Sequence, residues 1–189
     1  MEFKEGLTVG IDLGTVYSTL AYLNDDGTPI PVEDEQGKEG TPSVVLFAET
    51  GRAVVGPNRM RAAMEDPTRI VECVKRHMGE TEDEFKMTFD SKKVTPEFLS
   101  ALILKKVRKQ AEEVLGKKIG NCVITVPYYF NDLRRKATQD AGQIAGLNVL
   151  DIINEPTAAT LTYAWLQKQL GTSSSEDDPP RHVLLYDLG

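Results

Sequence analysis

The sequence predicts an α/β fold, with a mixed sheet flanked by helices. Three observations favour this class. The chain begins with two apolar runs, 7–13 and 17–23, which are joined at Gly14–Thr15 and are typical of paired strands. From residue 95 onward, helix patterns alternate with apolar strand patterns, as in sheets with helical connections. Hydrophobic residues make up 40% of the 189 residues and charged residues 27%, which is enough apolar material for one packed core.

The stretch between residues 24 and 94 predicts short elements. Asp26–Gly27 is a hairpin signal, and 44–47 is expected to form a strand. Residues 57–65 are expected to form a helix, and 67–78 to begin a second one. The segment 85–94 predicts a short hairpin.

A long helix is expected after residue 95. Thr95 suits the N-cap, Pro96 the first helical position and Gly116 the stop. Apolar residues recur at helical spacing and predict one inner face: Leu99, Ile103, Val107, Ala111 and Val114.

Strands and helices alternate in the last third of the chain. The strand 122–126 ends at Pro127, and Asn131 caps a helix that Gly146 closes. The inner face of that helix is predicted to carry Leu133, Ala137, Ala141 and Ile144. Further elements are a strand at 149–153, a helix from Glu155 to about Lys168, a polar loop at 171–180 and a strand at 183–186.

Charge and composition argue against several function classes. The net charge of −7 argues against general affinity for nucleic acid or anionic membranes. No apolar stretch reaches the roughly 20 residues that span a bilayer, and the first ten residues show no secretory pattern. Cys73 and Cys122 are expected to be free thiols, and His77 and His182 have no metal-ligand spacing.

Asp12 is the first candidate for a functional role, because a carboxylate at the end of an apolar strand needs water, a partner or a cation. Gly14 allows close approach of backbone to a ligand, and Thr15 adds a hydroxyl. Such a turn suits a phosphate held with Mg²⁺, although a plain hairpin with a solvent-facing acid fits the same residues. The motif Asp-Leu-Gly returns at 187–189, which favours two hairpins that face one polyphosphate.

Other candidates have both a functional and a structural interpretation. Glu155 follows a strand, where α/β sheets bind ligands, but it also suits the first turn of a helix. Lys75 has the reach to contact a phosphate, yet such a lysine is more often a solvated helix residue. Pro127 stops a strand, and Arg134 and Arg135 are most simply surface charge.

Several segments carry a family resemblance that covers nearly the whole chain. "VGIDLGTVYS", "GTPSVVLF", "VKRHMG", "CVITVPYYFNDLRRKATQDAGQIAGLNVLDIINEPTAAT" and "VLLYDLG" resemble, in that order, the ATPase domain of the seventy-kilodalton heat-shock chaperones, the DnaK-like family. The resemblance implies an actin-like, ribonuclease-H-like fold. It implies that 1–182 form the first lobe, with a core at 1–40 and 117–170 and a smaller subdomain at about 41–116. Residues 183–189 would then begin a truncated second lobe.

The resemblance also assigns site residues. Asp12 matches the aspartate that holds the Mg²⁺ water shell, and Gly14, Thr15, Val16 and Tyr17 match the first phosphate loop. Lys75 matches a lysine that reaches the γ-phosphate and the attacking water. Glu155 and Asp187 match acids near the metal and that water. Pro127 and Arg135 match a relay of nucleotide state towards the substrate domain.

By resemblance, the complete protein is an ATP-hydrolysing, heat-shock type chaperone that assists protein folding in a stress response. Its expected ligands are Mg²⁺ with ATP or ADP. Its expected partners are unfolded peptides bound by a C-terminal domain, a J-domain co-chaperone and a nucleotide-exchange factor, in a bacterial-type cytoplasm. No nucleic-acid or membrane partner is expected. The fragment alone is expected to be inactive, with weak or no nucleotide affinity, an exposed apolar patch and an unpaired C-terminal strand.

Three departures from the family pattern leave alternatives open. Val16 stands where a second threonine is usual, the segment 75–95 is shorter than in most members, and Gln139 stands where bacterial members often carry lysine. The first two lend slight support to a non-hydrolysing relative, such as an actin-like polymer subunit or a nucleotide-sensing scaffold. A small-molecule kinase of the same superfamily is the other alternative, but it would lack "NEPTAA" and "VPYYFND".

Overall fold

The computed structural model describes residues 3–34, 37–48, 51–56, 66–168 and 182–186. The predicted helix at 57–65, the predicted loop at 171–180 and the candidate Asp187 lie outside the described residues. Among the described residues, no helix is both long and apolar enough to cross a membrane.

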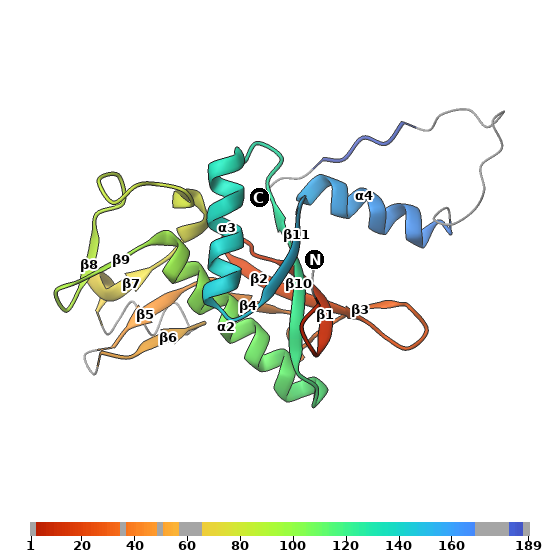
Figure 1. Ribbon diagram of the computed structural model, residues 1–189, viewed down its shortest axis with the longest axis horizontal. Helices are drawn as coiled ribbons and strands as arrows, with labels where there is room; N and C mark the ends of the chain where they lie inside the picture. Colours follow the sequence, from red (N-terminus) through yellow and green to blue (C-terminus); the bar gives the residue numbers. More distant parts are fainter. Residues whose placement is uncertain (1–2, 35–36, 49–50, 57–65, 169–181, 187–189) are drawn as a thin grey trace.

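A six-stranded mixed sheet forms the centre of the structure, as predicted (Figure 1). The strand order is β11-β10-β1-β2-β3, and β4 also pairs with β2. Strand β10 runs parallel to both β1 and β11, whereas β2 is antiparallel to β1, β3 and β4. The bounds are β1 Leu7–Asp12, β2 Tyr17–Leu23, β3 Pro29–Pro31, β4 Gly40–Pro42, β10 Ile119–Val126 and β11 Asn148–Asn154.

Two helices, α2 (Pro96–Leu115) and α3 (Asp132–Ile144), lie together on one side of β10 and β11 (Figure 1). A third helix, α4 (Glu155–Leu166), extends from the opposite side. The predicted caps are confirmed. The Thr95 side chain accepts a hydrogen bond from the Phe98 amide, and that of Asn131 accepts one from the Arg134 amide.

The core lies between the sheet and the α2–α3 pair, and it contains Ile11, Ile124, Leu99 and Ile103, each at most 1% exposed. Some predictions for the helix faces were wrong. Val114, Leu133 and Ile144 are 51%, 59% and 56% exposed. Residues four positions apart in a helix are rotated by about 40° beyond a full turn. A series of residues at that spacing therefore moves gradually away from the buried face. The buried residues of α3 are Ala137, Thr138, Ala141 and Gly142.

A small region beyond α2 contains the described residues between 45 and 94. Its three-stranded sheet has the order β6-β5-β7, and a separate hairpin pairs β8 with β9 as predicted. Two short 3₁₀ helices, η1 (Pro67–Arg69) and η2 (Val74–His77), flank β7. The strand bounds are β5 Val45–Phe47, β6 Ala53–Val55, β7 Ile70–Val71, β8 Met87–Phe89 and β9 Lys92–Val94.

Two element predictions differ from the structure. The expected helix at 67–78 is interrupted, because the β-branched pair Ile70–Val71 adds to β5 and Cys73 has a left-handed backbone with φ of 55°. The expected strand at 183–186 is not formed, because no strand of the described residues pairs with it; the side chains of Leu184 and Tyr186 are exposed.

Candidate functional site

Three parallel strands end at one edge of the large sheet. Asp12, the last residue of β1, pairs with Thr125 of β10, and Val126 of β10 pairs with Asn154 of β11. The next residues along the chain are Pro127 and Glu155. The carboxyl ends of strands in open α/β sheets are the usual place for ligands, so the edge is the candidate site.

The turn after β1 requires glycine. A Cβ at Gly14 would lie 2.0 Å from the carbonyl oxygen of Tyr17, so any side chain there would collide with backbone. Thr15 is half-buried, while Val16 and Tyr17 are 47% and 56% exposed. The turn therefore presents backbone and the Thr15 hydroxyl at the edge, and its role as a phosphate loop stays a prediction.

The Asp12 carboxylate is exposed and is oriented by a neighbouring strand. The hydroxyl of Thr125 donates a 2.9 Å hydrogen bond to Oδ1 of Asp12. Sequence reasoning missed Thr125. Its role depends on the parallel register of β1 and β10, which join segments more than a hundred residues apart and leave no local pattern.

Lys75 is 7% exposed, although a solvated helix residue was the simpler expectation. Its ammonium group donates to the carboxylate of Glu155, with which it forms an ion pair. Lys75 comes from η2 in the small region, and Glu155 is the first residue of α4 at the sheet edge. The structure thus joins two predicted site residues that are 80 positions apart.

Arg135 is also more than a surface charge. Its Nε donates a 3.0 Å hydrogen bond to the carbonyl oxygen of Phe130, and its guanidinium contacts the side chain of Asn154. Asn154 directly precedes Glu155, so Arg135 links α3 to the segment that carries this acid. Pro127 directly follows β10, and its carbonyl accepts a hydrogen bond from the Phe130 amide at 3.1 Å. The predicted relay role of Pro127 and Arg135 stays a prediction.

The potential metal ligands among the described residues do not gather into one cluster. The described residues contain no cluster of three or more histidine, cysteine, aspartate or glutamate side chains, and Asp187 lies outside them. Burial raises the pKa of the Cys122 thiol to about 12, which keeps this residue of β10 protonated. Asp12 and Glu155 are thus the predicted metal-site acids that the structure places at the edge.

Comparison with known proteins identifies the family. The family model described as "Hsp70 protein" matches residues 8–189. The chain is 45% identical over its full length to the chaperone protein DnaK of Thermotoga neapolitana, and 44% identical to those of Thermotoga petrophila and Thermotoga maritima. It spans about 30% of the length of each of these relatives.

The mixed sheet flanked by helices, taken with this match, defines the actin-like, ribonuclease-H-like fold class. The chain belongs to the Hsp70 family. The fold class and family predicted from the sequence are therefore confirmed.

Proposed function

We propose that this chain is the first nucleotide-binding lobe of an ATP-hydrolysing molecular chaperone. The observation that carries the proposal is the Lys75–Glu155 ion pair, at the same sheet edge as Asp12 and the Gly14 turn. It supplies a buried cation beside the acids that phosphoryl transfer needs. Membership of the Hsp70 family supports the same activity.

The residues at the edge fit a nucleotide phosphate with Mg²⁺. The tight turn at Gly14 leaves backbone amides and the Thr15 hydroxyl for anionic oxygens. Asp12 is exposed and held by Thr125, which suits a carboxylate that binds a hydrated cation through water. The bound metal would neutralise developing negative charge on the phosphates.

Lys75 would place a positive charge beside the terminal phosphate. Glu155 holds the ammonium group in place, and a carboxylate retains capacity to accept a hydrogen bond from water. Asp187 is proposed as a second acid that orients or deprotonates the attacking water. Positioning and charge neutralisation of this kind account for most of the catalysis in phosphoryl transfer to water.

Further roles belong to the complete protein. ATP binding and hydrolysis would control the grip on an unfolded peptide held by a C-terminal domain, with Pro127 and Arg135 relaying the nucleotide state. A J-domain co-chaperone and a nucleotide-exchange factor are the proposed partners, and the cytoplasm the proposed location. For residues 1–189 alone we expect little nucleotide affinity, because in this class a second lobe completes the site.

The test measures single-turnover hydrolysis of Mg-ATP, with and without unfolded peptide. It uses a full-length Hsp70 protein that contains this chain. Lys75→Ala is expected to lower turnover by about 100-fold or more, because it removes the cation from a positioned site. Lys93→Ala is the matched control, since Lys93 is an exposed lysine of the same small region. We expect it to leave turnover unchanged.

Slow turnover that peptide accelerates and Lys75→Ala abolishes would support the chaperone proposal. Tight ATP binding without turnover in either condition would contradict it. That outcome would favour the nucleotide-sensing scaffold, with Val16 as the first residue to replace.

A further inference from the structure

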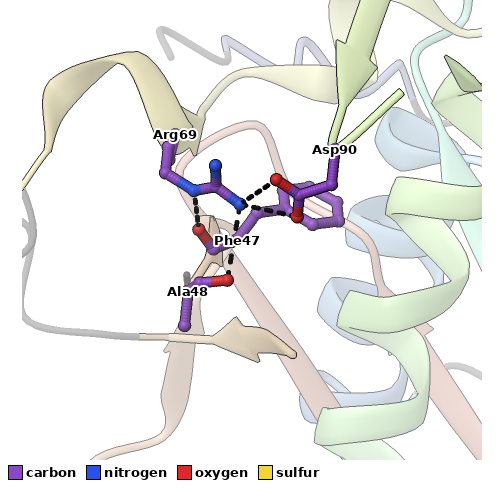
Figure 2. Close-up of polar contacts among 4 residues, drawn as sticks. All are labelled: Phe47, Ala48, Arg69 and Asp90. Carbon is purple, nitrogen blue, oxygen red and sulfur yellow. Dashed lines mark hydrogen bonds and ion pairs between the residues drawn. The ribbon is translucent and has the colours of Figure 1, made fainter. Parts of the chain in front are cut away.

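One guanidinium group holds two parts of the small region together (Figure 2). Nε of Arg69 donates to the carbonyl oxygen of Phe47, and Nη2 donates to that of Ala48 at 3.4 Å. Nη2 also contacts both carboxylate oxygens of Asp90, at 2.8 and 3.0 Å. The Arg69 side chain is only 19% exposed. These contacts, here called the Arg69 clamp, fix the end of β5 to the β8–β9 turn.

The β8–β9 turn places the acid of the clamp at a position that aspartate readily adopts. Asp90 and Ser91 have φ values of 49° and 64°, and a two-residue hairpin turn of this kind favours asparagine, aspartate or glycine at its first position and glycine at its second. Asp90 accepts this conformation and supplies the carboxylate that Arg69 binds. The rings of Phe47 and Phe89 stack beside it with centroids 4.1 Å apart. The β8–β9 turn is therefore held by the ion pair between Arg69 and Asp90 and by the stacked rings of Phe47 and Phe89.

The clamp lies on the segment that leads to Lys75. Arg69 ends η1 and is followed at once by β7, in which Val71 pairs with Val45 of β5. The left-handed Cys73 then turns the chain into η2, which carries Lys75. On the far side of Lys75, Met78 is 1% exposed, and the hydroxyl of Ser100 in α2 donates to its sulfur at 3.2 Å. The segment is thus anchored both before and after the lysine.

We infer that Arg69 is a positioning residue for Lys75. The clamp fixes β5, β7 and the β8–β9 turn as one unit, so that η2 presents the ammonium group to the sheet edge where Glu155 receives it. This inference rests on the proposed ATPase function. The inference assigns a role to a residue that does not contact the candidate site and lies in no sequence motif named above. An arginine is needed because its planar fork reaches two carbonyl oxygens and a carboxylate at once, which a lysine ammonium group cannot do.

The test uses the same full-length Hsp70 protein and the variants Arg69→Gln and Asp90→Asn. Asparagine keeps the shape of Asp90 and tolerates the left-handed backbone, so Asp90→Asn removes the charge with the fold retained. Ser91→Gly is the matched control, because it changes the same turn and relieves strain without touching the clamp. Thermal unfolding is measured for every variant.

Single-turnover hydrolysis is expected to fall about tenfold in Arg69→Gln and less in Asp90→Asn, because small displacements of a positioned group lower the rate strongly. Arg69→Lys should recover only part of the loss. ADP affinity should change by less than about twofold, because ADP lacks the phosphate that Lys75 is proposed to contact. Ser91→Gly should match the wild type. In Lys75→Ala, adding Arg69→Gln should cause no further loss of turnover.

Wild-type turnover in Arg69→Gln, with Lys75→Ala inactive, would overturn this inference and leave the proposed function standing. An equal loss of ATP and ADP affinity, together with a lower unfolding temperature, would also overturn it, because the clamp would then act on the fold alone. Unchanged turnover in Lys75→Ala would overturn the proposed function and this inference together.

Discussion

The large sheet and the small region hold their shape in different ways. Strand β10 has eight residues between two parallel neighbours, and its Ile124 and Val126 are fully buried. The strands of the small region have two or three residues each, and the Arg69 clamp and a stacked aromatic pair join its parts. The candidate site takes Asp12 and Glu155 from the first region and Lys75 from the second.

This difference predicts how the molecule opens. Strands of two or three residues are expected to open locally at a lower free energy than a long strand buried between two neighbours. The proposed nucleotide chemistry at the sheet edge would therefore depend on the region expected to open more easily, because Lys75 belongs to that region. Variants that destabilise one region, with stability measured in both regions, test this difference directly.

The largest effect is expected in the large sheet. Ile124 is 0% exposed in β10, so Ile124→Ala leaves a cavity in the core. We expect the free energy of unfolding to fall by about 3 kcal/mol, measured by urea denaturation of residues 1–189. Ile144→Ala is the matched control, because Ile144 is 56% exposed at the end of α3; its loss should stay within about 0.5 kcal/mol. Similar losses in the two variants would contradict the assignment of the core.

A smaller and local effect is expected in the small region. Phe89 is 8% exposed and stacks on Phe47, so Phe89→Ala removes the contact between β8 and β5. Native-state hydrogen exchange should show opening free energies for β8 and β9 lower by about 2 kcal/mol, with amides of β10 unchanged. Phe98→Ala, at a 39% exposed position on α2, is the control. Equal faster exchange in β10 would show that the two regions open as one.

The sequence predicted the elements that local physics decides. Caps at Thr95 and Asn131, the stop at Gly116 and the β8–β9 hairpin each depend on residues close in the chain. The helix expected at 67–78 was wrong because pairing of Ile70–Val71 with β5 outweighs local preference, and β5 is more than twenty positions away. Local patterns contain no information on that partner.

The candidate site shows the same limit. Asp12, Lys75 and Glu155 were named from their residue types and from the family resemblance, but the ion pair between the last two was not predicted. Thr125 and Arg69 were missed, because a threonine in a strand and an arginine before a strand are ordinary residues until register and side-chain contacts are known. The roles of the site residues are therefore tested by variants rather than by the fold.

The smallest expected effect concerns the contact between α2 and β10, which is tested by measuring stability as a function of pH. Oε1 of Glu112 accepts hydrogen bonds from the Ile119 amide at 2.9 Å and from Nε of Arg108 at 3.1 Å. Partial burial raises the pKa of Glu112, but these two hydrogen bonds and the positive charges of Arg108 and Lys118 together outweigh it and hold the pKa below its usual 4.5. Because the folded pKa is lowered, the stabilisation is fully present above pH 4.5 and is lost as the pH falls through the folded pKa.

We therefore expect Glu112→Gln to lower the free energy of unfolding by about 1 kcal/mol near neutral pH, and the difference from wild type to shrink as the pH falls below 4.5. Urea denaturation across that range measures it. Glu113→Gln is the matched control, because Glu113 is 58% exposed and its ion pair with Lys109 lies on the surface; we expect less than about 0.5 kcal/mol at any pH. A loss in Glu112→Gln that stays constant with pH would mean that side-chain shape, and not the charge, holds α2 to β10. The contact between α2 and β10 would then depend on packing, as the core of the large sheet does.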